Sequence, residues 1–172
     1  MHMVDLEIDK VWSDMEKLYR LEYKLLQQGN YEEWFQTMFT EDIHYHMPVV
    51  SVRENRDEAV RSENELSYFD DNHRTLHLRV RKFGSDMSWT EYPPSRTRYF
   101  FQIMDVEPVE SNVFRVTSNI MLYFTRLDNV ENFFVGEKSD LVRCENGQWK
   151  VTKRKIIIDK SRLSAHSLCV FF

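Results

Sequence analysis

The chain has 172 residues and a formal net charge of −5, with 42% hydrophobic, 30% charged and 14% aromatic residues. This length predicts a single domain over residues 1–172 with one core. The acidic balance argues against nucleic acid as a partner, because such binding needs a basic surface. No run approaches the ~20 apolar residues of a membrane span, and the first 30 residues are unlike a signal peptide, so we expect a cytoplasmic protein with no membrane contact.

The first part of the chain, about residues 5–83, is predicted to be mainly helical. Apolar residues three and four apart indicate an amphipathic helix from Asp5 to Gln28, followed by Gly29 as a helix end. Asn30 and Glu33 resemble a capping box before a short second helix. The apolar stripe of this second helix would consist of Trp34, Phe35, Met38 and Phe39.

A strand is predicted next, and more helix after it. The stretch DIHYHMPVV, residues 42–50, alternates apolar side chains with histidines, as a strand with one buried face does. Pro48 suggests an edge strand or a bend. Ser62 and Glu65 resemble a second capping box, and the apolar spacing that follows predicts one or two helices over residues 60–83.

Strand patterns dominate from about residue 96 to the end at 172. The predicted strands cover residues 97–106, 112–127, 133–144 and 148–159, with a type I′ turn at Asn146-Gly147. Three helices followed by an antiparallel meander make an α+β plan. A strongly curved, mainly antiparallel sheet around the long N-terminal helix would have the cone shape of the nuclear transport factor 2-like (cystatin-like) fold. We expect the apolar ending LCVFF to dock onto its own sheet rather than onto another subunit.

Two pairs of histidines are candidates for chemistry. His44 and His46 share a strand face and could hold a metal with Glu41 or Asp42, although the polar face of an edge strand is the simpler interpretation. His73 and His77 share a helix face just after two aspartates and could act as a general base, although a plain helix surface is simpler. Two cysteines outside any CxxC pattern, Cys144 and Cys169, are expected to be buried thiols.

A basic segment interrupts this acidic chain. Residues 74–98 contain six basic and two acidic residues. Within it, the stiff pair Pro93-Pro94 precedes Arg96 and Arg98, which share one face of a predicted strand. A local reversal of charge is most simply a solvated face, but it also suggests a complementary partner. For Arg96 and Arg98, a salt bridge within the fold is a further alternative. The candidate subunit interface consists of Arg74, Arg79, Arg81, Arg96 and Arg98.

Four stretches together resemble one family. They are YEEWFQTMFTEDIHYHMP (31–48), MSWTEYPPSRTRYF (87–100), YFTRLDNVENFFVGEKSDLVR (123–143) and WKVTKRKIIIDKSRLSAHSLCVFF (149–172). In order and spacing they are similar to the small (beta) subunit of bacterial aromatic-ring-hydroxylating dioxygenases of the naphthalene, biphenyl and phenylpropionate type.

This resemblance implies a cytoplasmic hexamer of three large and three small subunits, in which the small subunits also self-associate as a trimer. The large subunit would hold a Rieske [2Fe–2S] centre and a mononuclear Fe(II), and would use electrons from NADH to convert an aromatic hydrocarbon or aromatic acid to a cis-dihydrodiol. The small subunit would be mainly structural, with no catalytic residue, cofactor or metal of its own.

Two other functions stay open at this point. The chain could be a free-standing dehydratase or isomerase of the same fold that uses His46, His73 or His77 with a carboxylate inside the cone. It could also be a homo-oligomeric binding module. An assembly subunit should have a cone filled by side chains, whereas an enzyme should have an open pocket with convergent polar groups.

Overall fold

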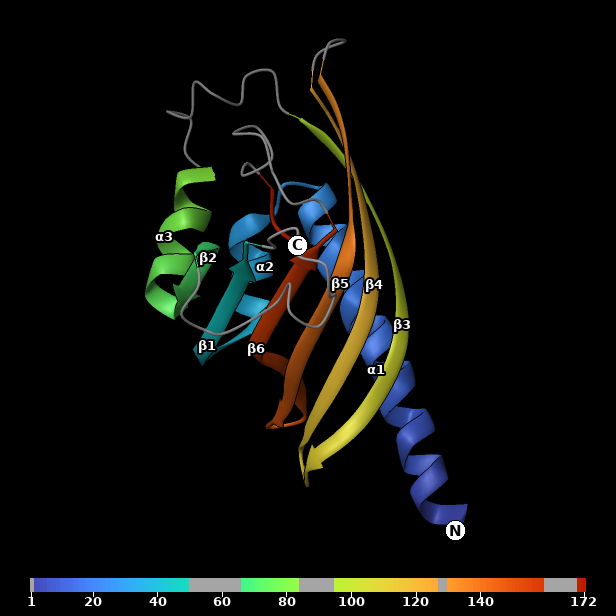
Figure 1. Cartoon of the computed structure of the whole chain (residues 1–172). Helices are drawn as coiled ribbons and strands as arrows, with labels where there is room; N and C mark the ends of the chain where they lie inside the picture. Colours follow the sequence, from blue (N-terminus) through green and yellow to red (C-terminus); the bar gives the residue numbers. More distant parts are fainter. Residues whose placement is uncertain (1, 50–65, 84–94, 127–129, 160–169) are drawn as a thin grey trace.

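The computed structural model describes residues 2–49, 66–83, 95–126, 130–159 and 170–172 (Figure 1). Within these ranges the helices are α1 (His2–Gln27), α2 (Tyr31–Met38) and α3 (His73–Phe83). The strands are β1 (Phe39–Pro48), β2 (Ser67–Asn72), β3 (Arg96–Glu110), β4 (Val113–Arg126), β5 (Val130–Glu145) and β6 (Gln148–Ile158). They form one sheet in the order β2-β1-β6-β5-β4-β3, in which only β1 and β6 are parallel neighbours.

The helical hairpin α1–α2 forms as the spacing predicts. Its buried stripe on α1 includes Val11, Met15, Tyr19 and Leu26, and Gly29 adopts a positive φ of 74° where the chain leaves the helix. The expected capping box does not form, because the Asn30 side chain makes no capping hydrogen bond and lies instead 3.5 Å from the amide oxygen of Gln28.

The helix predicted over residues 60–83 is wrong in its middle part. Residues 67–72 form strand β2, which pairs antiparallel with β1, and Leu66 is 83% exposed instead of lying in a helical stripe. The hydrogen bonds offered by β1 override the local helical pattern here. Helix α3 begins only at His73, where the side chain of Asn72 accepts a hydrogen bond from the backbone N–H of Thr75. The proposed cap at Ser62 and Glu65 lies outside the described residues.

Strand β1 is also not an edge strand. It lies between β2 and β6, and Pro48 is its last residue, next to a shift in the β1–β2 pairing. The strand begins at Phe39, which the helical spacing had assigned to α2; its backbone is already extended, with φ −117° and ψ 149°. Proline is tolerated here because the strand ends at it.

The four-strand meander β3–β6 is confirmed, including the turn at Asn146 and Gly147, whose φ values are 52° and 78°. Its long strands curve, and helix α1 lies along one side of them (Figure 1). The α+β cone is therefore confirmed. Cys144, near the end of β5, is half-buried rather than buried, and Cys169 lies outside the described residues.

The last three residues fill part of the interior, as expected for an ending that docks onto its own fold. Val170, Phe171 and Phe172 are at most 4% exposed. Tyr45 accepts a hydrogen bond from the Phe172 backbone N–H and donates one to the Phe172 oxygen, at 3.0 and 2.9 Å. The Tyr99 hydroxyl donates to the Phe171 carbonyl at 2.7 Å, and the Phe171 ring packs against Trp34.

Candidate functional site: a buried charge network and exposed arginines

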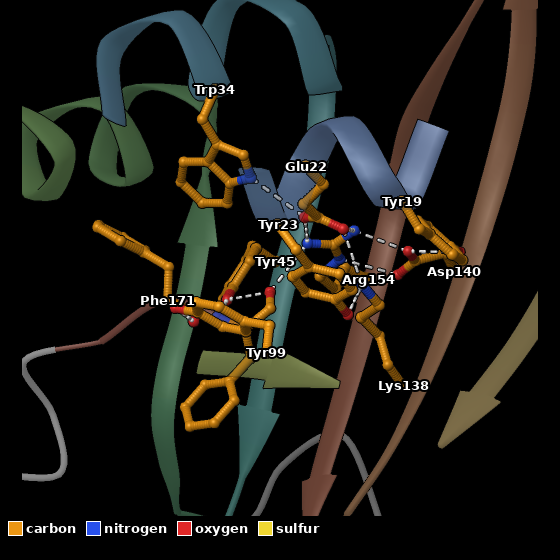
Figure 2. A network of polar contacts seen from close by, with 11 residues as sticks. Tyr19, Glu22, Tyr23, Trp34, Tyr45, Tyr99, Lys138, Asp140, Arg154 and Phe171 are labelled. Atoms are coloured by element: carbon orange, nitrogen blue, oxygen red, sulfur yellow. Dashed lines mark hydrogen bonds and ion pairs between the residues drawn. The ribbon is translucent and has the colours of Figure 1, made fainter. Parts of the chain in front are cut away.

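Four charged side chains lie completely buried in the interior, from three different elements (Figure 2). Glu22 comes from α1, Lys138 and Asp140 come from β5, and Arg154 comes from β6. Burying one unpaired charge is very costly, so such groups are expected to be paired. Here the formal charges of two carboxylates and two cations cancel.

Arg154 is at the centre of this network. Its Nε and Nη2 donate to the two oxygens of Asp140 at 2.9 and 2.8 Å, which is a bidentate pair. The other edge of the guanidinium donates to both oxygens of Glu22, and Nη1 also donates to the Phe172 oxygen at 2.9 Å. Arg154 thus connects α1, β5 and the terminal segment 170–172.

The remaining polar atoms of the network are also satisfied. Lys138 Nζ donates to Glu22 Oε2 at 2.8 Å and to the Tyr23 hydroxyl at 2.9 Å. Trp34 Nε1 donates to Glu22 Oε1 at 3.1 Å, and the Tyr19 hydroxyl donates to Asp140 at 2.9 Å. Each carboxylate therefore accepts hydrogen bonds from one or more cations and from an aromatic side chain.

The pKa values follow from this pairing. Burial alone would raise the pKa of Glu22, but the charges of Arg154 and Lys138 and their hydrogen bonds outweigh it and lower the pKa from 4.5 to about 2. Burial opposes the charge on Arg154 as well, yet Asp140 and Glu22 raise its pKa well above the usual value. Burial and the neighbouring guanidinium lower the pKa of Lys138, against the pull of Glu22.

The sequence contained a signal for these residues that our prediction did not use. On β5, Lys138 and Asp140 occupy the same side of the strand as the buried Phe134 and Val142. Arg154 likewise alternates with buried isoleucines on β6, and Glu22 interrupts the apolar stripe of α1. A charged residue at an inward position needs a buried partner of opposite charge, so these four positions could have been predicted together as a buried network.

The network holds the fold together and is not arranged for acid–base chemistry. Every charged group in it is saturated by groups of the same chain, and Phe171 and Phe172 pack beside it. Two surface depressions of about 600 and 560 Å³ lie elsewhere, beside Arg81 and beside Arg143. In the second one, Arg143 is already paired with Asp42 and Glu145.

The histidines on β1 do not form a metal site with their neighbours. His44 and His46 stack with ring centroids 5.6 Å apart, which confirms that they share a face. However, His44 Nε2 lies 2.6 Å from Asp70, and His46 Nε2 lies 2.9 Å from the Ser67 hydroxyl. In the part of the chain that the structure describes, no three His, Cys, Asp or Glu side chains are grouped to hold a metal ion.

The histidines on α3 do not form the expected dyad with Asp70 or Asp71. His77 Nε2 lies 2.9 Å from Glu32 of α2 instead and stacks on the Phe35 ring, and His73 contacts the same ring. Asp71 forms an ion pair with Arg79, with 2.7 Å between Nη2 and Oδ2. These contacts join α3 to α2 and β2, so the histidine–carboxylate pairs that exist are on the surface and support packing.

The five arginines of the candidate interface have different environments. The Arg79 side chain is 14% exposed and covers the Phe69 ring at 3.7 Å, so its charge is engaged within the chain. Arg74 and Arg81 are exposed on α3, and Arg96 and Arg98 are exposed at the start of β3. Among the described residues, neither Arg96 nor Arg98 has an ion-pair partner, so the internal salt bridge considered for them is not found there.

Comparison with solved structures defines the class of fold. The chain superposes on a structure of naphthalene 1,2-dioxygenase with indole bound, with a TM-score of 0.80 and 22% identity, covering 93% of this chain and 84% of that one. It also matches an NTF-2-like protein of Shewanella oneidensis with a TM-score of 0.54 and 13% identity, covering 84% and 97% of the two chains. The cone is therefore of the NTF2-like class.

Comparison of sequences then defines the family. The family described as "Ring hydroxylating beta subunit" matches residues 21–165. The biphenyl 2,3-dioxygenase subunit beta of Rhodococcus jostii (strain RHA1) is 35% identical over 164 residues, which cover 92% of this chain and 87% of that relative. The chain belongs to the family of ring-hydroxylating dioxygenase beta subunits, which confirms the resemblance seen in its sequence.

Proposed function

We propose that this chain is the noncatalytic assembly subunit of a terminal ring-hydroxylating dioxygenase, which converts an aromatic ring to a cis-dihydrodiol. The observation that carries the proposal is the filled interior of the cone. Glu22, Lys138, Asp140 and Arg154 are fully buried and saturate one another, so none of them is available to a substrate. An enzyme of this fold would need convergent polar groups that face an open pocket.

The partner in this proposal is the large, catalytic subunit, in a cytoplasmic hexamer of three large and three small subunits. Each small subunit would form a single domain. The Rieske [2Fe–2S] centre and the mononuclear Fe(II) would belong to the large subunit. Membership of the beta-subunit family supports a noncatalytic role for this chain beside a catalytic large subunit. The named relative is a subunit of a biphenyl dioxygenase, which supports an aromatic hydrocarbon as the substrate of the whole complex.

The exposed arginines are proposed to lie at subunit interfaces. Arg74 and Arg81 project from α3 and Arg96 and Arg98 from β3, while Arg79 anchors α3 against β2 by its ion pair with Asp71. Arg96 and Arg98, which have no ion-pair partner among the described residues, fit the rim of an interface with an acidic partner.

Co-expression with a candidate large subunit of a ring-hydroxylating dioxygenase tests the proposal. We expect the two chains to purify together with the mass of a hexamer and with ring-hydroxylating activity, and we expect the small chain alone to have no such activity. The matched control is the large subunit expressed alone. A large subunit that is stable and fully active without ever binding this chain would contradict the proposal.

A further inference from the structure

We infer that the interior of the cone contains a binding site for an aromatic acid or amide, and that residues 170–172 occupy this site as a bound ligand would. The chemical class follows from what the segment presents to the site, which is two phenyl rings, each joined to a carbonyl oxygen by a short saturated link. Such binding is a property of the small subunit alone, so it goes beyond the proposed function and does not require the large subunit.

The Phe171 ring lies among aromatic side chains from three elements. Its centroid is 4.8 Å from the ring of Trp34, 4.9 Å from that of Phe83 and 5.6 Å from that of Tyr31. The residue is only 1% exposed. Separations of this size are those of favourable aromatic pairs, so this position suits an aromatic ring better than an aliphatic group.

Three polar side chains hold the carbonyl oxygens of the segment (Figure 2). The Tyr99 hydroxyl donates to the Phe171 carbonyl at 2.7 Å. Arg154 Nη1 and the Tyr45 hydroxyl both donate to the Phe172 oxygen, each at 2.9 Å. The donors come from three different strands and converge on two neighbouring oxygens. A few convergent polar groups in an otherwise apolar pocket are what orient a small ligand.

A further cation beside the site has hydrogen-bonding capacity to spare. The central carbon of the Arg79 guanidinium lies 5.0 Å from the centre of the Phe171 ring and 5.2 Å from that of Tyr45. Its Nε and Nη1 are buried and make no hydrogen bond among the described residues, while Nη2 forms the ion pair with Asp71. Buried donors without an acceptor are costly, so Arg79 favours an aromatic ligand that carries an oxygen over a plain hydrocarbon.

The ring position is close to the surface on the side of α2 and α3. Tyr31, whose ring contacts Phe171, also lines the surface depression beside Arg81. Tyr31 and Phe83 are only half-buried. An incoming ring can therefore reach this position past side chains of two helices, without opening the sheet.

In the wild type the segment excludes free ligands from the site. Because the segment belongs to the same chain, its effective concentration at the site is on the order of millimolar. A free molecule that makes similar contacts must compete with it. The site is therefore closed as long as both rings of the segment are in place.

A full-length variant that loses both rings, Phe171→Ser with Phe172→Ser, tests the inference. Without the rings the segment has little apolar surface to bury, so it leaves the site open. We expect a blocked peptide of sequence Val-Phe-Phe to bind this variant one to one in titration calorimetry, and N-acetylphenylalanine amide to bind more weakly. A blocked Val-Ser-Ser peptide should not bind. The wild type should bind the Val-Phe-Phe peptide at least about tenfold more weakly.

A polar contact of the site supplies the second measurement. Adding Tyr99→Phe to the double variant removes the donor to the first phenylalanine carbonyl of the peptide. Affinity should fall roughly two- to tenfold, the value of one hydrogen bond, whereas nonspecific uptake of an apolar peptide would not change. The matched control, Phe100→Ser with Phe133→Ser, removes two exposed rings and should gain no peptide binding.

Circular dichroism checks that each variant is folded. If the double variant is unfolded, Phe171→Ala decides, because it keeps the backbone contacts of the segment and vacates one ring position, which should bind toluene. Four results would overturn the inference: no peptide binding by a folded double variant, equal binding of Val-Ser-Ser, equal affinity with and without Tyr99→Phe, or Phe171→Ala that takes up no toluene. None of these measurements involves the large subunit, so the proposed function is tested separately.

Discussion

At the scale of single residues, Arg154 joins three separate segments of the chain in the interior. Its guanidinium contacts Glu22 of α1, Asp140 of β5 and the oxygen of Phe172. A buried ion network is not in itself a source of great stability, because desolvation offsets much of the attraction. Removing one member is different, since the remaining charges then stay buried without a partner.

We therefore expect Arg154→Met to lower the free energy of unfolding by about 3–5 kcal/mol, measured by urea denaturation. The matched control is Arg20→Met, which removes an exposed pair with Glu16 on α1 and should change the free energy by less than about 0.5 kcal/mol. Similar losses in both variants would show that the buried network has no special role in stability.

The pKa of Glu22 predicts a dependence of stability on acid. Because this pKa is 4.5 in the unfolded chain and about 2 in the folded one, the ionised group stabilises the fold fully above pH 4.5. The contribution, roughly 3 kcal/mol from the difference of the two pKa values, is lost as the pH falls from 4.5 toward 2.

Unfolding free energies of the wild type and Glu22→Gln, measured across this pH range, check the prediction. The wild type should lose more stability with acid than Glu22→Gln does, and the exposed-site control Glu16→Gln should follow the wild type. Equal slopes in the wild type and Glu22→Gln would contradict the folded-state pKa.

At the scale of elements, the close contact of β5 and β6 depends on one glycine. Gly136 lies opposite Ile158, and a side-chain carbon added there would collide with the backbone of Ile157 and Ile158. The strand passes so close to its neighbour that only glycine fits without a shift.

Gly136→Ala should therefore destabilise the chain by about 1–3 kcal/mol, the usual cost of overpacking, measured as a lower midpoint in urea. Ser139→Ala, a substitution on the same strand at a half-buried position, is the control and should have a much smaller effect. A Gly136→Ala variant as stable as the wild type would mean that β6 can move away at little cost.

At the scale of the whole molecule, a cone-shaped fold can either enclose a ligand-binding pocket or serve as a subunit of a larger assembly. In this chain the inside of the cone is occupied by paired charges and by residues 170–172, while the outer face of β3–β5 presents exposed apolar groups and the exposed arginines Arg96 and Arg98. A fold by itself does not decide between these uses, because function depends on the groups placed in it. The co-expression experiment tests whether the outer surface of the cone binds another subunit.

Much of the fold could be predicted because its signals are local. The alternation of Phe114, Val116, Ile120 and Leu122 indicated β4, and Asn146-Gly147 indicated the turn before β6. The error at residues 67–72 had a physical cause: pairing with β1 is a contact between distant segments and outweighs local spacing. For the same reason the sequence grouped His73 and His77 with the nearby aspartates, whereas the fold pairs His77 with Glu32.

The sequence by itself determined the α+β plan and the basic character of residues 74–98, because periodicity, turn chemistry and composition depend on neighbours along the chain. It also indicated the family, through the resemblance of four stretches to ring-hydroxylating dioxygenase beta subunits. Only the tertiary structure decided which charges meet. Glu22 is 116 residues from Lys138 and 132 from Arg154, and contacts over such separations arise from packing, not from local pattern. The fold likewise turned Arg79 inward and left Arg96 and Arg98 exposed, although all three are arginines of one basic segment.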